Sequence, residues 1–343
     1  MALQAAYNQN TEIQQQKQVG LHNHLTVPWP ALAETPLPGK GRINAFEKEK
    51  NLTSTVTSNA AVINLNGAHD IEIKGKSITG AKEACITLTN CSNIHITGCK
   101  FINGNNRGIY LYNCHNITID FNFFSHLVTG VLADHCKGGI VVDHNQFLNM
   151  AGPMPGGQYV QFNTVNGAGS SISHNKGENI FGEGKPEDCI NLYKSNGTAN
   201  SPIKIIGNWI RGGGPSSSGG GIMLGDNGGS YQIARDNILV NPGEYGMAIA
   251  GGDHISMISN IIYGKSQPFT NVGLYVNAIG GYKVSNAIVK SNRIDFYNAS
   301  GYNNNWWLEG STQKPEGWDN GGNMLGDKTL NEQILPKTII TTK

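Results

Sequence analysis

An asparagine that returns at nearly regular intervals is the feature that most constrains how this chain can fold. It follows a short alternating apolar segment each time, and Cys99 and Lys76 continue the series toward the N-terminus. The successive spacings are 23, 23, 23, 30, 33, 29, 23 and 32 residues. A repeat of this length predicts one structural unit stacked many times. The asparagines are Asn122, Asn145, Asn175, Asn208, Asn237, Asn260 and Asn292.

A second series of short segments precedes each asparagine. Their apolar residues alternate with a period of 2, which indicates strands and excludes helices. A strand, a polar turn, a second strand and the asparagine therefore recur every 22–33 residues. The segments are GIYLYN (108–113), GVLADH (130–135), YVQFN (159–163), CINLYK (189–194), GIMLGD (221–226), GMAIAG (246–251) and GLYVNA (273–278).

The constant position of the asparagine distinguishes between two all-β architectures. A sandwich also has short strands and turns, but it does not require the same residue at the same offset in each unit. Stacked parallel coils do, because each asparagine can then hydrogen-bond the backbone of a neighbouring coil. We therefore expect a parallel β-helix of about nine coils, roughly 40–45 Å long at ~4.8 Å per coil.

Two stretches resemble the repeats of right-handed parallel β-helix proteins of the pectate-lyase-like superfamily. They are NCSNIHITGCKFINGNNRGIYLYNCHNITIDFNFF (90–124) and GGDHISMISNIIYG (251–264). The resemblance covers roughly residues 60–300. It implies an all-β, single-stranded, right-handed parallel β-helix, and parallel crossovers are in general right-handed. The superfamily includes pectate lyases, polygalacturonases, alginate lyases and epimerases, and phage tailspikes. The resemblance thus implies a polysaccharide partner and a secreted or cell-surface location.

The two ends of the chain differ from the repeat. We expect an N-terminal cap and strap over 1–60, the β-helix over 61–300, and a C-terminal cap and tail over 301–343. Residues 11–19 are predicted to form a short capping helix, and the Pro-rich residues 27–41 an extended strap. Caps are expected because the terminal coils of a stack expose apolar side chains and unpaired strand edges.

Composition excludes several partners. Charged residues make up 14% of the chain and the formal net charge is +1, so we expect neither nucleic acid nor an anionic membrane as partner. No apolar run is long enough to span a membrane, and the start of the chain lacks the basic and apolar regions of a signal peptide. We expect a monomer.

The six cysteines are predicted to be structural. Cys91, Cys114 and Cys136 occupy one offset in consecutive coils, which predicts a stack of buried thiols. A disulfide between neighbouring coils also fits the spacing of the coils. The remaining three, Cys85, Cys99 and Cys189, are predicted core residues.

Long loops around 150–157, 177–187, 195–202 and 211–220 predict a trough on one sheet, since function usually lies in loops on a rigid scaffold. Outward positions of the leading strands supply its polar side chains. Alternatives remain open for several: a surface pair for Asp134 and His135, and an ion pair between coils for Lys194 and Asp226. We predict catalytic residues among Lys194, Tyr193, Arg211, His135 and Asp134. Predicted substrate contacts are Arg107, Tyr110, Gln161, Asn163, Asp188, Asn191 and Asp226.

These residue types fit three functions. β-Elimination of a uronide needs a base such as Lys194, and a cation such as Arg107 or Arg211 beside the developing enolate. Hydrolysis needs two carboxylates about 5–10 Å apart, and Asp134 and Asp226 are three coils, or ~14 Å, apart. The sequence therefore favours a lyase acting on a uronic-acid polysaccharide over a hydrolase. The third function is non-catalytic glycan binding or a structural role.

The catalytic motifs of the known enzymes in the superfamily are absent. The chain lacks the Asn-Thr-Asp, Asp-Asp and Gly-His-Gly pattern of polygalacturonases, the Arg-x-Pro-x-x-Arg of pectate lyases and the Asp-Pro-His-Asp of epimerases. No cofactor is identified. Ca²⁺ bound by carboxylates of the trough is an option, but no ligand loop is recognisable.

Overall fold

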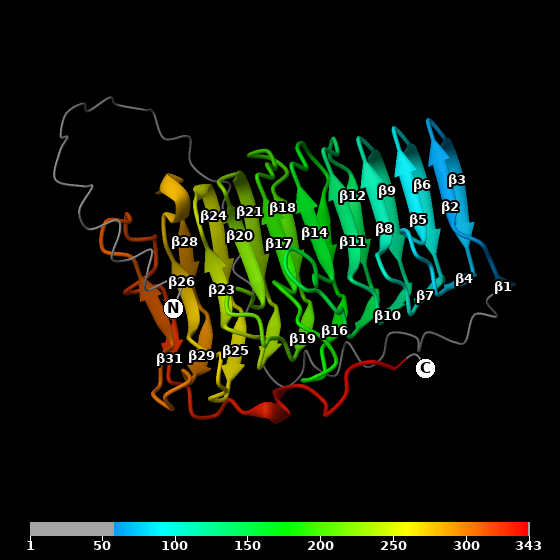
Figure 1. Cartoon of the computed structure of the whole chain (residues 1–343). Coiled ribbons are helices and arrows are strands. Elements are labelled where there is room, and N and C mark those ends of the chain that lie inside the picture. Colours follow the sequence, from blue (N-terminus) through cyan, green and yellow to red (C-terminus); the bar gives the residue numbers. More distant parts are fainter. Residues whose placement is uncertain (1–57, 342–343) are drawn as a thin grey trace. The chain divides into compact units, whose positions relative to one another are not determined.

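The computed structural model describes residues 58–341, which belong to one compact unit. Three parallel sheets run along this unit, and successive strands of the chain enter the three sheets in turn (Figure 1). This is the predicted parallel β-helix. The expected capping helix (11–19) and strap (27–41) lie outside the described residues.

Each sheet takes one strand from every coil. Sheet A contains β1 (Ser58–Asn59), β4 (Lys76–Thr79), β7 (Lys100–Ile102), β10 (Phe123–Ser125), β13 (Gln146–Leu148), β16 (Lys176–Glu178), β19 (Trp209–Arg211), β22 (Ile238–Val240), β25 (Ile261–Gly264), β29 (Arg293–Phe296) and β31 (Met324–Leu325). Sheet B contains β2 (Ile63–Asn66), β5 (Ile86–Thr89), β8 (Arg107–Tyr112), β11 (Thr129–Asp134), β14 (Val160–Asn163), β17 (Ile190–Tyr193), β20 (Ile222–Asp226), β23 (Tyr245–Ile249), β26 (Val272–Val276) and β30 (Trp306–Leu308). Sheet C contains β3 (His69–Lys74), β6 (Ser92–Thr97), β9 (His115–Asp120), β12 (Ile140–Asp143), β15 (Ser171–Ser173), β18 (Ile203–Ile206), β21 (Ser230–Arg235), β24 (Gly252–Ile258), β27 (Val284–Ser285) and β28 (Ile288–Lys290).

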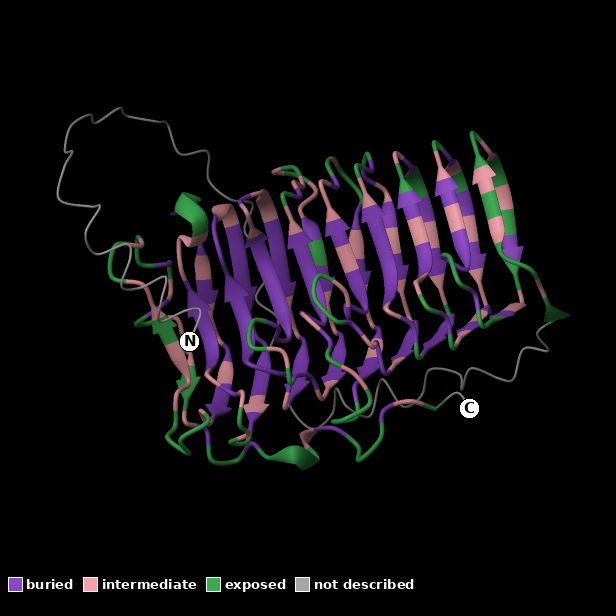
Figure 2. Cartoon of the chain, viewed as in Figure 1, coloured by how far each residue is buried: buried purple, intermediate pink, exposed green. Residues whose placement is uncertain are grey.

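The leading strands predicted from the sequence lie in sheet B, and their apolar residues face the core as expected. Ile109 and Leu111 of β8 are fully buried and lie opposite Val131 and Ala133 of β11. Figure 2 shows the buried residues concentrated on the strands, with exposed residues at the turns and on the first coil. Side chains thus stack like on like along the coils.

The asparagine ladder is confirmed. Each side chain reaches back to the preceding coil: Asn145 Oδ1 accepts the backbone N–H of Asn122 at 3.0 Å, and its Nδ2 donates to the Ile119 carbonyl at 2.8 Å. Cys99 takes the same position earlier, since its Sγ accepts the Lys76 N–H at 3.4 Å. The ladder also continues one coil further than the sequence indicated, to Asn323, which accepts the Asn292 N–H at 3.1 Å.

A left-handed residue precedes each ladder position and forms the corner between sheets C and A. Several of these residues are not glycine, so the corner presents a column of side chains. The ladder holds this backbone conformation in place, although it is uncommon for residues other than glycine. The column runs through Gly75, Gly98, Phe121, His144, His174, Gly207, Asp236, Ser259 and Ser291, with φ between 52° and 66°.

All six cysteines are buried and free, as the predicted thiol stack requires, and no disulfide forms among them. The Cys114 thiol donates to the Leu88 carbonyl of the preceding coil and to the Tyr112 carbonyl, both at 3.4 Å. Cys85, Cys99 and Cys189 lie in the main hydrophobic core, as expected.

The C-terminal segment closes the core and then runs back along sheet A. Trp306 stacks on Trp318 with ring centroids 4.0 Å apart at the end of the core. Residues 326–341, the tail, then follow the outer face of sheet A (Figure 1). The tail buries Leu330, Leu335 and Ile339 against Trp209, Ile238, Val240 and Ile261.

Polar contacts fix the tail in place. Arg211 Nη2 donates to the carbonyl oxygens of Glu332 and Leu335, both at 2.8 Å, and Glu178 Oε2 accepts the Ile339 N–H at 3.0 Å. Helical structure in residues 58–341 is limited to the 3-10 turns η1 (Ile279–Gly281) and η2 (Glu332–Ile334), and no helix there is long or apolar enough to cross a membrane.

Candidate functional site

The loops that lead from sheet A into sheet B are long in the middle of the stack, as the sequence predicts, and they contact one another from coil to coil. The hydroxyls of Ser218 and Ser216 both donate to the Glu187 carboxylate, at 2.7 and 2.6 Å. These hydrogen bonds join the loops before β17 and β20. Phe181 and Phe269 stack at 5.9 Å across more distant loops. The loops therefore gather near the first residues of β17, β20 and β23.

Asp188 lies at this point, two residues before β17. It is only 4% exposed, and three donors surround its carboxylate. Asn191 Nδ2 donates to Oδ2 at 2.7 Å, and the Gly220 N–H and the Tyr245 hydroxyl donate to Oδ1. β17 packs its apolar residues in the core, and the polar residues in and beside it are tolerated because they form a buried hydrogen-bonded group.

Gly220 allows Tyr245 to reach Asp188 across two coils. The two side chains occupy one file along the stack, and the glycine stands between them. A Cβ at Gly220 would lie 2.7 Å from two ring carbons of Tyr245. Only a residue without a side chain fits here without displacing the ring.

A bulge in β20 brings Asp226 to the same group. Asn191 pairs with Met223, but Tyr193 pairs with Asp226, so β20 contains one extra residue. Gly225 adopts φ +62° at this bulge. Asn191 Nδ2 donates to Asp226 Oδ2 at 3.0 Å as well as to Asp188. Bulges commonly redirect a side chain next to an active site.

Four carboxyl groups influence one another here: Glu187, Asp188, Asp226 and Glu244. Burial raises the pKa of Asp188 to about 7, although hydrogen bonds from Tyr245, Asn191 and Gly220 lower it. Burial likewise raises the pKa of Glu244 to about 7 and raises that of Asp226. At neutral pH Asp188 and Glu244 are therefore partly protonated, whereas ordinary carboxyls are ionised. We call Asp188, Asn191, Asp226 and Tyr245 the carboxylate cluster.

Four other predicted residues form a separate group on β8 and β11. The Arg107 guanidinium lies 5.2 Å from the Tyr110 ring centroid, and the Tyr110 hydroxyl donates to Asp134 Oδ2 at 3.3 Å. His135 Nδ1 lies 2.7 Å from Asp134 Oδ1. The coil of β14 lies between β11 and β17, where the carboxylate cluster begins, so the predicted residues form two groups instead of one.

Gln161 and Asn163 of β14 connect toward the carboxylate cluster. Gln161 Nε2 donates to Asn163 Oδ1 at 2.6 Å and to Asn191 Oδ1 at 3.1 Å. Predicted substrate residues from two coils thus meet around the Asn191 side chain.

Lys194 and Arg211 are not placed as the sequence suggested. The bulge puts Asp226 opposite Tyr193, so the expectation that Asp226 and Lys194 share a column is wrong by one residue. The Lys194 ammonium lies 5.1 Å from the Tyr193 ring centroid instead. Arg211 belongs to sheet A and is held by the tail, so it does not reach over sheet B.

The outer face of sheet B also becomes apolar from Met223 of β20 onward. Alternation with the core residues directs Met223, Ala248 and Tyr275 outward, yet all three are buried. They form a second apolar cluster with Tyr245, Ala250 and Val272. Polar outward side chains therefore end at the carboxylate cluster.

Comparisons with known proteins agree with this architecture. A family model described as "Right handed beta helix region" matches residues 40–183. The chain is a right-handed parallel β-helix. Comparison with curated proteins gives no match.

Among solved structures, this β-helix is similar to the catalytic domain of a GH87 alpha-1,3-glucanase in complex with nigerose. The TM-score is 0.51 at 12% identity, over 75% of this chain and 50% of that chain. Dettilon tailspike protein gives 0.37 at 11% identity, over 76% and 60%. The A-module of the mannuronan C-5 epimerase AlgE4 from Azotobacter vinelandii gives 0.28 at 12%, over 78% and 87%. The β-helix thus spans half of the glucanase domain and 60% of the tailspike.

Sequence reasoning missed Tyr245 and the neighbouring acids Glu187 and Glu244. Tyr245, Gly220 and Asp188 each stand two residues before the first core residue of their strand in sheet B. Extending the alignment of the β-helix strands by two residues on the N-terminal side would have placed the three in one file.

Proposed function

We propose that this β-helix hydrolyses glycosidic bonds of an extended, neutral polysaccharide, with Asp188 and Asp226 as the pair of carboxyl groups. The observation that supports this most directly is the Asn191 amide, which donates to both carboxyls from adjacent coils. Their oxygens can be no further apart than the sum of 2.7 and 3.0 Å. Two carboxyls at about 5–5.5 Å are typical of glycosidases that retain anomeric configuration.

The protonation of the pair also supports hydrolysis. Hydrolysis needs one carboxyl that keeps a proton for the leaving oxygen and one that acts in its ionised form. With its pKa raised to about 7, Asp188 can hold a proton near neutrality. Asp226 is less buried and faces the outer side of sheet B. We therefore assign it as the ionised carboxylate that acts on the anomeric carbon of the substrate.

A neutral substrate fits this site better than a uronate. Four carboxyls lie close together, and a further negative charge is unfavourable beside them. The two arginines predicted to neutralise an enolate lie elsewhere, Arg107 over Tyr110 and Arg211 under the tail. We therefore place β-elimination second to hydrolysis. The proposal that Ca²⁺ assists stays a prediction.

The test is an assay of product chemistry. One of the similar solved structures is an alpha-1,3-glucanase, so alpha-1,3-glucan is the first substrate to try, beside other neutral glucans, polygalacturonate and alginate. We expect new reducing ends from a neutral glucan and at least about a hundredfold less with Asp226→Asn. Asp319→Asn, which changes an exposed carboxylate paired with Lys314, should keep full activity.

Other results would support other functions. An ultraviolet-absorbing unsaturated product from a uronate would support elimination and overturn hydrolysis. A glycan that raises the melting temperature without any product would support a binding module. Because extended polysaccharides lie outside cells, each of these functions leads us to expect a secreted or cell-surface protein.

A further inference from the structure

A second group of chemically active side chains lies on sheet C, away from the carboxylate cluster. It occupies the corner between sheets C and A, where His144 and His174 take the left-handed position in successive coils, with φ 52° and 54°. The ladder asparagines that follow, Asn145 and Asn175, are locked by hydrogen bonds between coils. The backbone of both histidines is therefore fixed before any ligand arrives.

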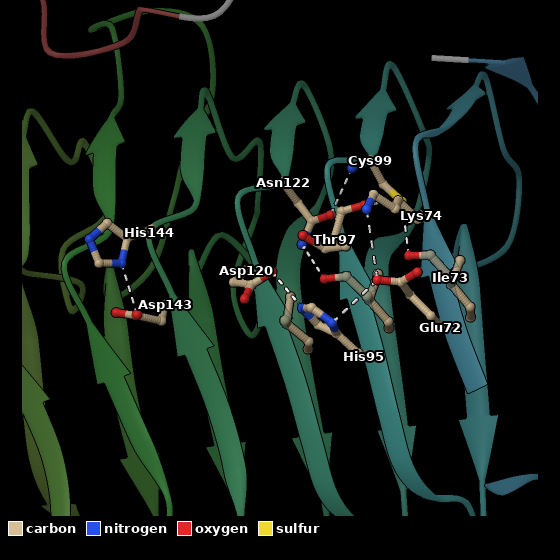
Figure 3. A network of polar contacts seen from close by, with 12 residues as sticks. Glu72, Ile73, Lys74, His95, Thr97, Cys99, Asp120, Asn122, Asp143 and His144 are labelled. Atoms are coloured by element: carbon tan, nitrogen blue, oxygen red, sulfur yellow. Dashed lines mark hydrogen bonds and ion pairs between the residues drawn. The ribbon is translucent and has the colours of Figure 1, made fainter. Parts of the chain in front are cut away.

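Asp143, the last residue of β12, joins the two histidines. His144 Nδ1 lies 2.8 Å from Asp143 Oδ2, and His174 Nδ1 lies 3.0 Å from Asp143 Oδ1. One ligand atom from each of the three residues lies within 4.8 Å of the others. Figure 3 shows Asp143 and His144 directed toward each other beside the neighbouring strands of sheet C.

Packing restricts the rings further. Phe121 of the preceding coil stacks on His144 with centroids 5.2 Å apart, and the two imidazoles are 4.9 Å apart.

We propose that Asp143, His144 and His174 bind a divalent transition metal ion of the Zn²⁺ class, a site that also cross-links two coils. Imidazole nitrogens with one carboxylate oxygen are ligands that Zn²⁺ accepts, at about 2.0–2.2 Å. The ion takes the place of the contacts that join the two imidazoles to Asp143, and any proton held between them is released to solvent. Small ring rotations bring the three ligand atoms around one centre, and water completes the coordination.

The neighbouring His95 marks the limit of the site. It lies between two carboxylates, 2.8 Å from Asp120 and 3.7 Å from Glu72, as Figure 3 shows. His95 is the one imidazole in its group with Glu72 and Asp120, whereas Asp143 contacts two imidazoles, those of His144 and His174. Imidazole pairs favour Zn²⁺ over Ca²⁺ or Mg²⁺, which prefer oxygen ligands.

The test is zinc binding to the full chain after treatment with a chelator. We expect wild type to bind Zn²⁺ in a calorimetric titration, and His174→Asn to bind at this site at least about tenfold more weakly. Asparagine is chosen because it tolerates the left-handed conformation. Co²⁺ added to wild type should give visible absorption bands that the variant lacks, and Zn²⁺ should raise the melting temperature of wild type but not of this variant.

His254→Asn is the matched control. Asp253 and His254 repeat the same dipeptide with φ 54° and a 2.7 Å contact, but Ser285 and Asn286 occupy the other oxygen of Asp253. This variant should bind zinc like wild type. If His174→Asn does not fold, Asp143→Asn replaces it. The proposal is overturned if wild type binds no zinc, or if a folded variant at Asp143 or His174 binds it with unchanged affinity.

Discussion

At Asp188, burial raises the pKa by more than the three hydrogen-bond donors lower it, so the stability of the protein should depend on pH. In the unfolded chain its pKa is close to 3.8, whereas in the folded protein it is about 7. Between these two values the folded protein binds a proton that the unfolded chain does not. The free energy of unfolding should therefore fall as pH rises from about 4 to 7, by up to about 1.4 kcal/mol per pH unit, and then level off.

Asp188→Asn should remove this contribution to the slope, because the amide does not titrate. Urea unfolding at a series of pH values measures it for both proteins. Glu244 adds a slope of the same sign in both, so the difference between the curves is the readout. Parallel curves would show that burial does not shift Asp188 in this way.

Gly220 should be intolerant of substitution. Gly220→Ala places a methyl group against the Tyr245 ring and pushes the hydroxyl away from Asp188. We expect a loss of roughly 1–3 kcal/mol in unfolding free energy, typical of overpacking. Gly310→Ala is the control, since nothing lies within 4 Å of its added Cβ. Equal stabilities of the two variants would contradict the close approach.

At the scale of the strand and turn, the sequence predicted which residues face the core but not which residues come together in the carboxylate cluster. Alternation and a constant asparagine offset carry the core pattern, because both reflect stacking of one coil on the next. The bulge at Gly225 changes the alignment by one residue, and a glycine in a Gly-rich segment does not reveal it. The tail has no periodicity, so its docking on sheet A and its capture of Arg211 could not be predicted.

The ladder asparagine should contribute much more than an exposed one. Asn208 accepts the Asn175 N–H at 3.0 Å and donates to the Ile172 carbonyl at 2.9 Å, both buried. Asn208→Ala leaves these groups unsatisfied, so we expect a loss of at least about 2 kcal/mol in thermal or urea unfolding. Asn64→Ala, at an exposed position of β2, should change little. A ladder variant as stable as this control would argue against the ladder's role.

The tail should depend on its contact with Arg211. Arg211→Gln removes charge-assisted hydrogen bonds to two tail carbonyls, at a cost of roughly 1–3 kcal/mol in local opening. Hydrogen exchange of the Ile339 amide should then speed up, whereas Lys337→Gln, an exposed change, should leave it unaltered. Unchanged exchange in Arg211→Gln would mean that the apolar contacts alone hold the tail.

At the scale of the whole molecule, nearly every contact joins a coil to its neighbours, so a complete coil should be removable. Deleting residues 123–145 takes out 23 residues and joins Asn122 directly to Gln146 in ladder register. We expect a folded β-rich protein with a cooperative but lower thermal transition, because repeat stabilities are roughly additive. Deleting only 123–134 breaks the register and should abolish that transition. Similar behaviour of the two deletions would contradict the stacked-coil account.

The tail has one more implication, for the order in which the molecule is assembled. Residues 326–341 leave the ribosome after every strand they cover, and they reach back to Glu178 and Gln146 in the middle of the stack. Coils can form one by one as the chain emerges, since each needs only the coil before it. Docking of the tail then follows the formation of the coils that it covers, and it secures sheet A only on chains whose translation has passed the last coil.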